Sequence, residues 1–316
     1  MSWALASYAC ILAVFRLGLS RWTIAGSLGE SLPYAFASFA FLLAPLWFFG
    51  FGAGEWLRDG IRSRWLRIVS PALLGIPYLV FAFPSGDFHW SLGTAMIALP
   101  VVLAALLEFS ALPPKFAWQD LAVLGILAAT HILRVLAGAW PHAGVAALAK
   151  LFIADLALYL YVVVRKLEGI GYSFIPTRAA VLIGLREWTY FLPFGIGLGA
   201  ALKFTHFHPR LPAAMSVATS VLVTFLLVAI PEEMFFRGIL QNLLETRFGR
   251  RTALVTSAVL FGLAHFNKGA GFNWRYVLLA AIAGVFYGRA WRAQRQLLAS
   301  VIGHTAVDVV WSLWFK

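Results

Sequence analysis

The stretch AAMSVATSVLVTFLLVAIPEEMFFRGILQN, residues 213–242, joins an uncharged apolar run to a cluster of charges. Residues 213–230 carry no charge and approach the roughly 20 apolar residues with which an α-helix crosses a bilayer. Glu232, Glu233 and Arg237 follow directly. Ionisable groups within a membrane are costly, and they usually face a protein interior or a water-filled cavity. The stretch therefore predicts a membrane helix that carries a buried polar site.

The composition extends this prediction to the whole chain. Of its 316 residues, 61% are hydrophobic and only 12% are charged, which is too apolar for a soluble domain of this size. We expect an all-α fold, a polytopic transmembrane helix bundle with about nine to eleven spans. The single cysteine, Cys10, excludes an intrachain disulfide and a cysteine-based metal cluster.

Basic residues occur in short clusters between the apolar runs. This distribution is typical of orientation signals in membrane proteins, so we expect membrane lipids and no nucleic acid as partners. In an eleven-span arrangement the clusters share one side, which the positive-inside rule places in the cytoplasm together with the N-terminus. We expect a multi-pass protein, in the inner membrane of a bacterium. The clusters lie at 58–67, 115, 165–186, 247–251 and 289–295.

The chain divides near residues 165–188, where a joining segment or an interfacial helix is expected. Residues 1–165 are predicted to form N-terminal transmembrane helices without an assigned role. The intramembrane charges of the opening stretch lie in the part of the chain that follows this segment.

Four polar residues of this second part reach similar depths in the membrane. At 1.5 Å per helical residue, Glu232, His265 and Asp308 lie about 20 Å from the basic side. His304 lies about 13 Å from it. Because the residues come from three helices, the agreement indicates one buried site.

Helical spacing separates the two glutamates. Glu233 and Arg237 are four residues apart and share a helix face, so we expect them to form an ion pair. Glu232 points about 100° away and is left to face the histidines. A carboxylate beside imidazoles, shielded from bulk water, is suited to act as a general base.

Three segments in this order, EEMFFRG, FGLAH and GHTAVD, resemble the motifs of the CaaX-processing and bacteriocin-processing (CPBP) family of intramembrane proteases. This family includes the type II CaaX prenyl endopeptidases, and the resemblance covers about residues 185–316. It implies that Glu232 is the catalytic carboxylate and that His265 helps it to activate water. It further implies that His304 and Asp308 hold the water or stabilise the oxyanion.

One position departs from the family pattern. Many members have Asn where this chain has Asp308, and an ionised carboxylate cannot donate a hydrogen bond. The resemblance implies supporting roles for Glu233 and Arg237.

The predicted function is that of an intramembrane endopeptidase, which uses a glutamate-activated water to hydrolyse a peptide bond near the membrane. Its substrate would be a membrane-associated peptide or protein. The alternative is a non-catalytic membrane scaffold or transporter with a buried polar cluster. Titratable residues at one depth favour the protease, because a proton path would distribute them across the membrane.

No cofactor is expected, since the three side chains can activate water without a metal and the HExxH pattern is absent. Zinc is the alternative, with Glu232, His265 and His304 as ligands and an open position for water. The cavity around these residues is expected to open toward the cytoplasmic leaflet or laterally between helices.

Overall fold

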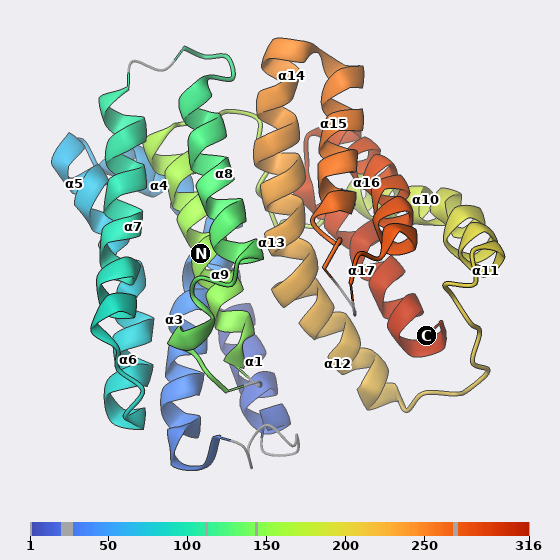
Figure 1. The fold of residues 1–316 in the computed structure, drawn as a ribbon, viewed down its shortest axis with the longest axis horizontal. Coiled ribbons are helices and arrows are strands. Elements are labelled where there is room, and N and C mark those ends of the chain that lie inside the picture. Colours follow the sequence, from blue (N-terminus) through green and yellow to red (C-terminus); the bar gives the residue numbers. More distant parts are fainter. Residues whose placement is uncertain (1, 20–27, 111–112, 143–144, 268–270, 316) are drawn as a thin grey trace. The chain divides into compact units, whose positions relative to one another are not determined.

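The computed structural model describes residues 2–19, 28–110, 113–142, 145–267 and 271–315. Helices make up about 80% of the chain, and the described residues form no strand beyond one isolated bridge between Phe207 and Phe315. The prediction of an all-α fold is confirmed. The chain folds as two compact units, Met1–Glu168 and Gly169–Lys316 (Figure 1). The functional assignment of each part stays a prediction.

Among the described residues, six helices are long and apolar enough to cross a membrane. This supports a multi-pass membrane protein, but it does not confirm nine to eleven spans. Two of the expected spans are short: α8 (Trp118–Ile132) has 15 residues and α15 (Arg250–Leu263) has 14. The six helices are Gly29–Phe49, Arg64–Ser85, Trp90–Phe109, Ala147–Val164, Ala214–Phe248 and Leu297–Trp314.

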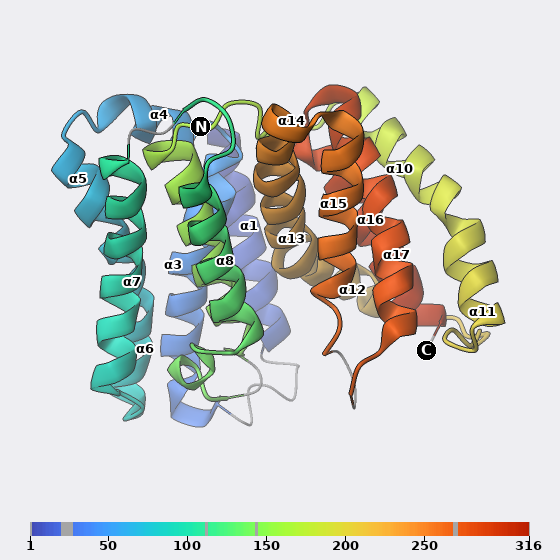
Figure 2. The same cartoon turned by 45° about the horizontal axis from the view of Figure 1, so that its top comes forward.

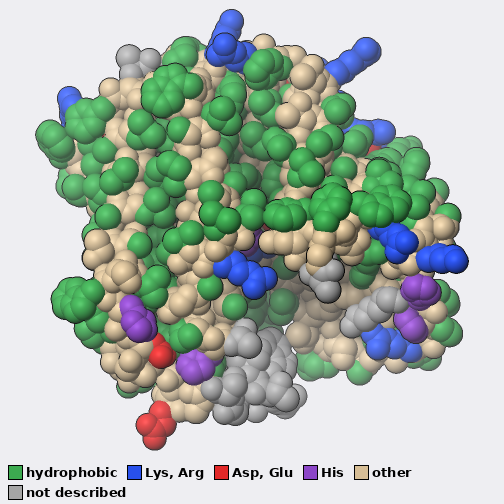
Figure 3. Space-filling model, viewed as in Figure 1, with side chains coloured by type: hydrophobic (Ala, Val, Ile, Leu, Met, Phe, Trp, Pro, Cys, Tyr) green, Lys and Arg blue, Asp and Glu red, His purple; other side chains and the backbone are tan. Residues whose placement is uncertain are grey.

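Large hydrophobic side chains are exposed on many of these helices. Examples are Phe41, Trp90 and Val102 in the N-terminal unit. Figure 3 shows one face on which hydrophobic side chains are widespread and acidic ones are rare. Such surfaces are stable against lipid and would aggregate in water.

In the N-terminal unit, α9 (Ala147–Tyr159) and the π-helical segment η5 (Leu160–Val164) are almost entirely buried. Asp155 on α9 is buried as well. The ion pairs of this unit include Arg67 to Glu108 with an N–O distance of 2.9 Å, and Arg165 to Asp120 with 3.0 Å. The remaining helices are α1 (Ser2–Leu19), α3 (Leu32–Phe49), α4 (Ala53–Gly60), α5 (Arg64–Val69), α6 (Ile76–Ser85), α7 (Trp90–Phe109) and α8.

The C-terminal unit contains one long helix, residues 214–248, which Figure 1 shows running from α12 through α13 to α14 and Figure 2 shows from a second direction. It comprises α12 (Ala214–Thr224), η7 (Phe225–Ala229), α13 (Ile230–Glu233), η8 (Met234–Gln241) and α14 (Asn242–Phe248). The helices α15, α16 (Trp274–Gln294) and α17 (Leu297–Trp314) follow it. Before it come α10 (Arg178–Leu192), η6 (Pro193–Leu198) and α11 (Gly199–Ala201).

The two ends of this unit are fastened by different contacts. At one end, Arg295 forms an ion pair with Glu245 and Arg292 donates to the carbonyl of Arg250 at 2.9 Å. At the other end, Arg210 donates to the carbonyl of Leu313 at 2.7 Å. Successive helices therefore run between the same two ends in alternating directions.

Close helix packing in the C-terminal unit depends on glycine. At Gly184 on α10, an added Cβ would lie 2.6 Å from the carbonyl oxygen of Ala299 and 2.9 Å from Cβ of Ile302. The backbones of α10 and α17 approach this closely because Gly184 has no side chain.

We expect Gly184→Ala to destabilise the protein by about 1–3 kcal/mol, the usual cost of overpacking. The measurement is the thermal unfolding midpoint in detergent. The matched control is Gly197→Ala on the same helical segment, where an added Cβ meets nothing within 4 Å. An unchanged midpoint for Gly184→Ala would show that α10 and α17 are not packed as described.

Candidate active site

The two glutamates lie on α13, a four-residue α-helical turn between the π-helical segments η7 and η8. Pro231 precedes them and has no N–H to donate to the preceding turn. π-Helical turns place hydrogen bonds between residues i and i+5, and they are frequent at functional sites. The irregular backbone thus sets the directions of Glu232 and Glu233.

Glu233 is the buried centre of the site. Its Oε2 lies 3.2 Å from Nε of Arg237, and its Oε1 accepts a hydrogen bond of 2.8 Å from Nδ1 of His304. The side chains of Glu233 and Arg237 are fully buried. The predicted ion pair is confirmed, and the contact with His304 was missed by the sequence analysis. One carboxylate therefore joins the long helix to α17.

Arg237 contacts α16 and the ring of Phe261 as well as Glu233. Its guanidinium donates to the carbonyl of Gly284 at 3.1 Å and lies 4.4 Å from the ring centroid of Phe261. It also lies 5.4 Å from the ring of Tyr287. Cation–π contacts of this kind offset part of the cost of burying the charge.

Glu232 faces the two histidines, as its position on the helix predicts. Its Oε2 lies 4.0 Å from Nε2 of His265 and 3.9 Å from Nε2 of His304. These separations exceed direct hydrogen bonds, but one water about 2.6–3.2 Å from each atom fits among them. The structure thus brings together three of the residues that the sequence placed at similar depths.

In both histidines, Nδ1 forms a hydrogen bond with another group of the protein. Nδ1 of His265 hydrogen-bonds the carbonyl oxygen of Phe261 at 2.8 Å, so it carries the proton and leaves Nε2 as an acceptor in the neutral ring. Nδ1 of His304 donates to Glu233. Both Nε2 atoms are therefore turned toward Glu232. Asp308 lies beside them, with its Oδ2 3.4 Å from Nε2 of His304.

Two tyrosines on α16 complete the walls. The ring of Tyr287 stacks on His304, with centroids 4.7 Å apart and an interplanar angle of 10°. The ring of Tyr276 lies 5.1 Å from that of His265. The sequence analysis missed both residues. Their spacing of eleven residues, which places them on one face of a helix, is the signal that could have found them.

A cavity of about 240 Å³ lies against these groups, and all its lining residues belong to the C-terminal unit. His265, His304 and Asp308 line it. Glu232 is not among its lining residues, but its Oε2 lies within 4.0 Å of Nε2 of both histidines. The further lining residues are Phe191, Thr224, Phe261, Tyr276, Leu279, Ala280, Ala283, Tyr287, Val307, Trp311 and Ser312.

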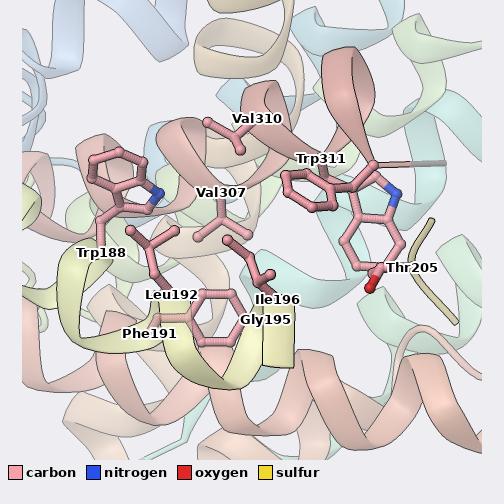
Figure 4. A pocket seen from close by; sticks show the side chains of 10 residues that line it. Trp188, Phe191, Leu192, Gly195, Ile196, Thr205, Val307, Val310 and Trp311 are labelled. Carbon is pink, nitrogen blue, oxygen red and sulfur yellow. The ribbon is translucent and has the colours of Figure 1, made fainter. Parts of the chain in front are cut away.

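A narrower apolar crevice of about 30 Å³ adjoins the cavity between α10 and α17 (Figure 4). The two spaces share Phe191, Val307 and Trp311 as walls. Trp188 and Thr205 lie on the crevice side. The cavity is therefore bordered by apolar side chains on the side of the crevice.

The three candidate ligands do not have the spacing of a zinc site. Ligands held tetrahedrally at about 2.0–2.1 Å from zinc stand about 3.3–3.4 Å apart. The Glu232 oxygen is 3.9 and 4.0 Å from the two imidazole nitrogens, so all three groups would have to move inward. Within the described residues, no group of three or more His, Cys, Asp or Glu side chains has a geometry that could hold a metal ion.

Residues 214–310 match one protein-family model, described as Type II CAAX prenyl endopeptidase Rce1-like. The matched segment contains all six residues of the predicted site, and it supports the resemblance to the CPBP family. No curated protein and no solved structure is significantly similar to the chain.

We expect Glu233→Gln to lower stability by about 3–5 kcal/mol, because it leaves the buried Arg237 without its counter-charge. The measurement is thermal unfolding in detergent. Glu232→Gln is the matched control: the Glu232 side chain is 15% exposed, and its loss of charge leaves no buried arginine uncompensated. Equal midpoints for the two variants would contradict the structural role of Glu233.

Proposed function

We propose that this membrane protein is an intramembrane endopeptidase of the glutamate type, and the match of residues 214–310 to the Rce1-like type II CAAX prenyl endopeptidase model supports the proposal. One observation carries the proposal: Oε2 of Glu232 lies within 4.0 Å of Nε2 of both His265 and His304. A water in that space would contact the carboxylate of Glu232, which is the proposed base, and Nε2 of both His265 and His304. The substrate would be a membrane-associated peptide or protein.

In the proposed reaction, the water gives one hydrogen bond to Glu232 and one to Nε2 of His265. Its lone pair then points away from both acceptors, toward the cavity. When the water attacks the carbonyl carbon, Glu232 takes its proton and the carbonyl oxygen becomes an oxyanion. The peptide nitrogen leaves after it receives that proton from Glu232, so the base returns to its starting state.

His304 would stabilise the oxyanion. Its Nδ1 proton is held by Glu233, and a proton on Nε2 would point into the site. A donor aimed at a developing oxyanion typically contributes about 2.7–4 kcal/mol to the lowering of the barrier. Asp308 lies 3.4 Å from the same nitrogen and would orient its N–H by accepting a hydrogen bond from it. An ionised carboxylate cannot itself donate a hydrogen bond to the oxyanion.

The arrangement of the other charges supports a local reaction more than transport. In the N-terminal unit, Arg67 pairs with Glu108 and Arg165 pairs with Asp120. These are ion pairs that link helices. The cluster with facing titratable groups and an adjoining cavity lies in the C-terminal unit.

We expect Glu232→Gln to lower peptide cleavage by about 10²–10⁴-fold, since it removes the general base and preserves the shape. The measurement compares protein termini in membrane fractions from cells with the wild-type and the variant protein. Asp308→Asn makes the same change of carboxylate to amide, and we expect it to retain most of the activity because an amide still hydrogen-bonds His304. Near-normal processing by Glu232→Gln would overturn the catalytic assignment.

We further expect the purified protein to retain its activity in the presence of a zinc chelator, because the proposed reaction uses only side chains and water. Cleavage is followed before and after incubation with the chelator, and zinc is then added back. Loss of activity with recovery on zinc addition would assign Glu232, His265 and His304 as metal ligands instead.

A further inference from the structure

The cavity lies toward one particular end of the C-terminal unit. On α17 its lining residues run from His304 to Ser312, away from the Arg295 end of that helix. On α16 they run from Tyr276 to Tyr287, before the basic residues at the other end of the helix. On α15 they occur only after its first three turns, at Phe261 and beyond. All three helices therefore place the cavity at the same end.

Exposure changes in the same direction along α17. The side chain of His304 is 3% exposed, and that of Asp308, one turn farther from Arg295, is 39% exposed. In the opposite direction the site is closed, because Arg237 and Gln241 are fully buried and Glu245 is covered by Arg292 and Arg295. The site is thus covered on the arginine-rich side and more open on the Asp308 side.

The two ends differ strongly in charge. The closed end carries eight arginines and the acidic residues Glu187 and Glu245, whereas the described residues at the open end include three cations. Lys268 lies outside the described residues. The eight arginines are Arg178, Arg186, Arg247, Arg250, Arg251, Arg289, Arg292 and Arg295; the three cations are Lys203, Arg210 and Arg275.

Contacts between helices join several of these arginines at one end. Arg289 lies 3.1 Å from Glu187, which is also paired with Arg186. Thr177 at the start of α10 hydrogen-bonds Gln296 at the start of α17. The positive-inside rule assigns such an arginine-rich end to the cytoplasm. This end is the one from which the cavity is closed.

We propose that the cavity opens on the side of the membrane opposite the cytoplasm and receives peptide segments that have been translocated across it. The sequence had suggested a cytoplasmic or lateral opening, and the positions of the lining residues disagree with the cytoplasmic one. Translocated segments next to membrane spans are poor in Lys and Arg. Such segments carry few positive charges that Arg210 and Arg275, the arginines of the open end, would repel. The direction in which the cavity opens does not depend on the proposed function. The identification of the peptide segment as a substrate does rest on the proposed function.

Cysteine labelling in intact cells tests the direction. In a Cys10→Ser background, Ser312→Cys introduces a thiol at the open end, and Thr252→Cys introduces an exposed one at the arginine-rich end. A membrane-impermeant maleimide should label position 312 in intact cells and position 252 only after the membrane is permeabilised. The reverse pattern would overturn the proposal, as would a lack of labelling at position 312 in permeabilised cells. Thr224→Cys, also in the cavity wall, replaces Ser312→Cys if that variant does not fold.

A second measurement separates this inference from the proposed function. The labelling is repeated in Glu232→Gln, where the pattern should be unchanged because accessibility does not need catalysis. Termini that differ between the wild-type protein and Glu232→Gln should then lie in segments outside the cytoplasm. If the altered termini lie only in cytoplasmic segments, the proposed substrate class is refuted. If the labelling is as expected but no termini are altered, only the peptidase activity is refuted.

Discussion

The contact on which the site depends is the buried carboxylate of Glu233 between Arg237 and His304. It balances a guanidinium that has no access to water, and it fixes the imidazole of α17 against the long helix. Breaking a buried pair by removing one partner leaves an uncompensated charge, which is far more costly than the pair is favourable. The geometry around Glu232 is therefore maintained by its neighbour in the sequence. The two adjacent carboxylates thus differ in their surroundings: Glu233 is fully buried, and Glu232 faces the two histidines.

Much of this site could be predicted because membrane helices follow simple periodicities. Depth along a helix follows from residue count, and faces follow from spacing of four, so Glu232, His265, His304 and Asp308 could be brought together from their positions alone. The contact between Glu233 and His304 could not, because it depends on how α17 is rotated about its own axis. The same is true of Tyr276 and Tyr287, which read as ordinary aromatic residues of an apolar helix.

The number of spans was harder to predict for a physical reason. Apolar runs of 14 or 15 residues are compatible with short membrane helices and with helices that pack inside a bundle, and composition does not distinguish them. The continuous helix of residues 214–248 shows the opposite difficulty, since the charges of Glu232, Glu233 and Arg237 predict the end of a span within it. In the structure the helix continues through them, because Glu233 and the ring of Phe261 accommodate the charge.

The π-helical segments on both sides of α13 determine where the long helix tolerates a change in its length. In a π turn, one more residue is enclosed by each hydrogen-bonded ring than in an α turn. Loss of a single residue from η7 or η8 is therefore absorbed when that segment returns to α-helical winding, because the residues on either side keep their directions. A deletion within α12 or α14 has no extra residue to give up. Because consecutive residues differ by about 100° in direction, such a deletion turns one part of the helix relative to the other without altering any side chain of the site.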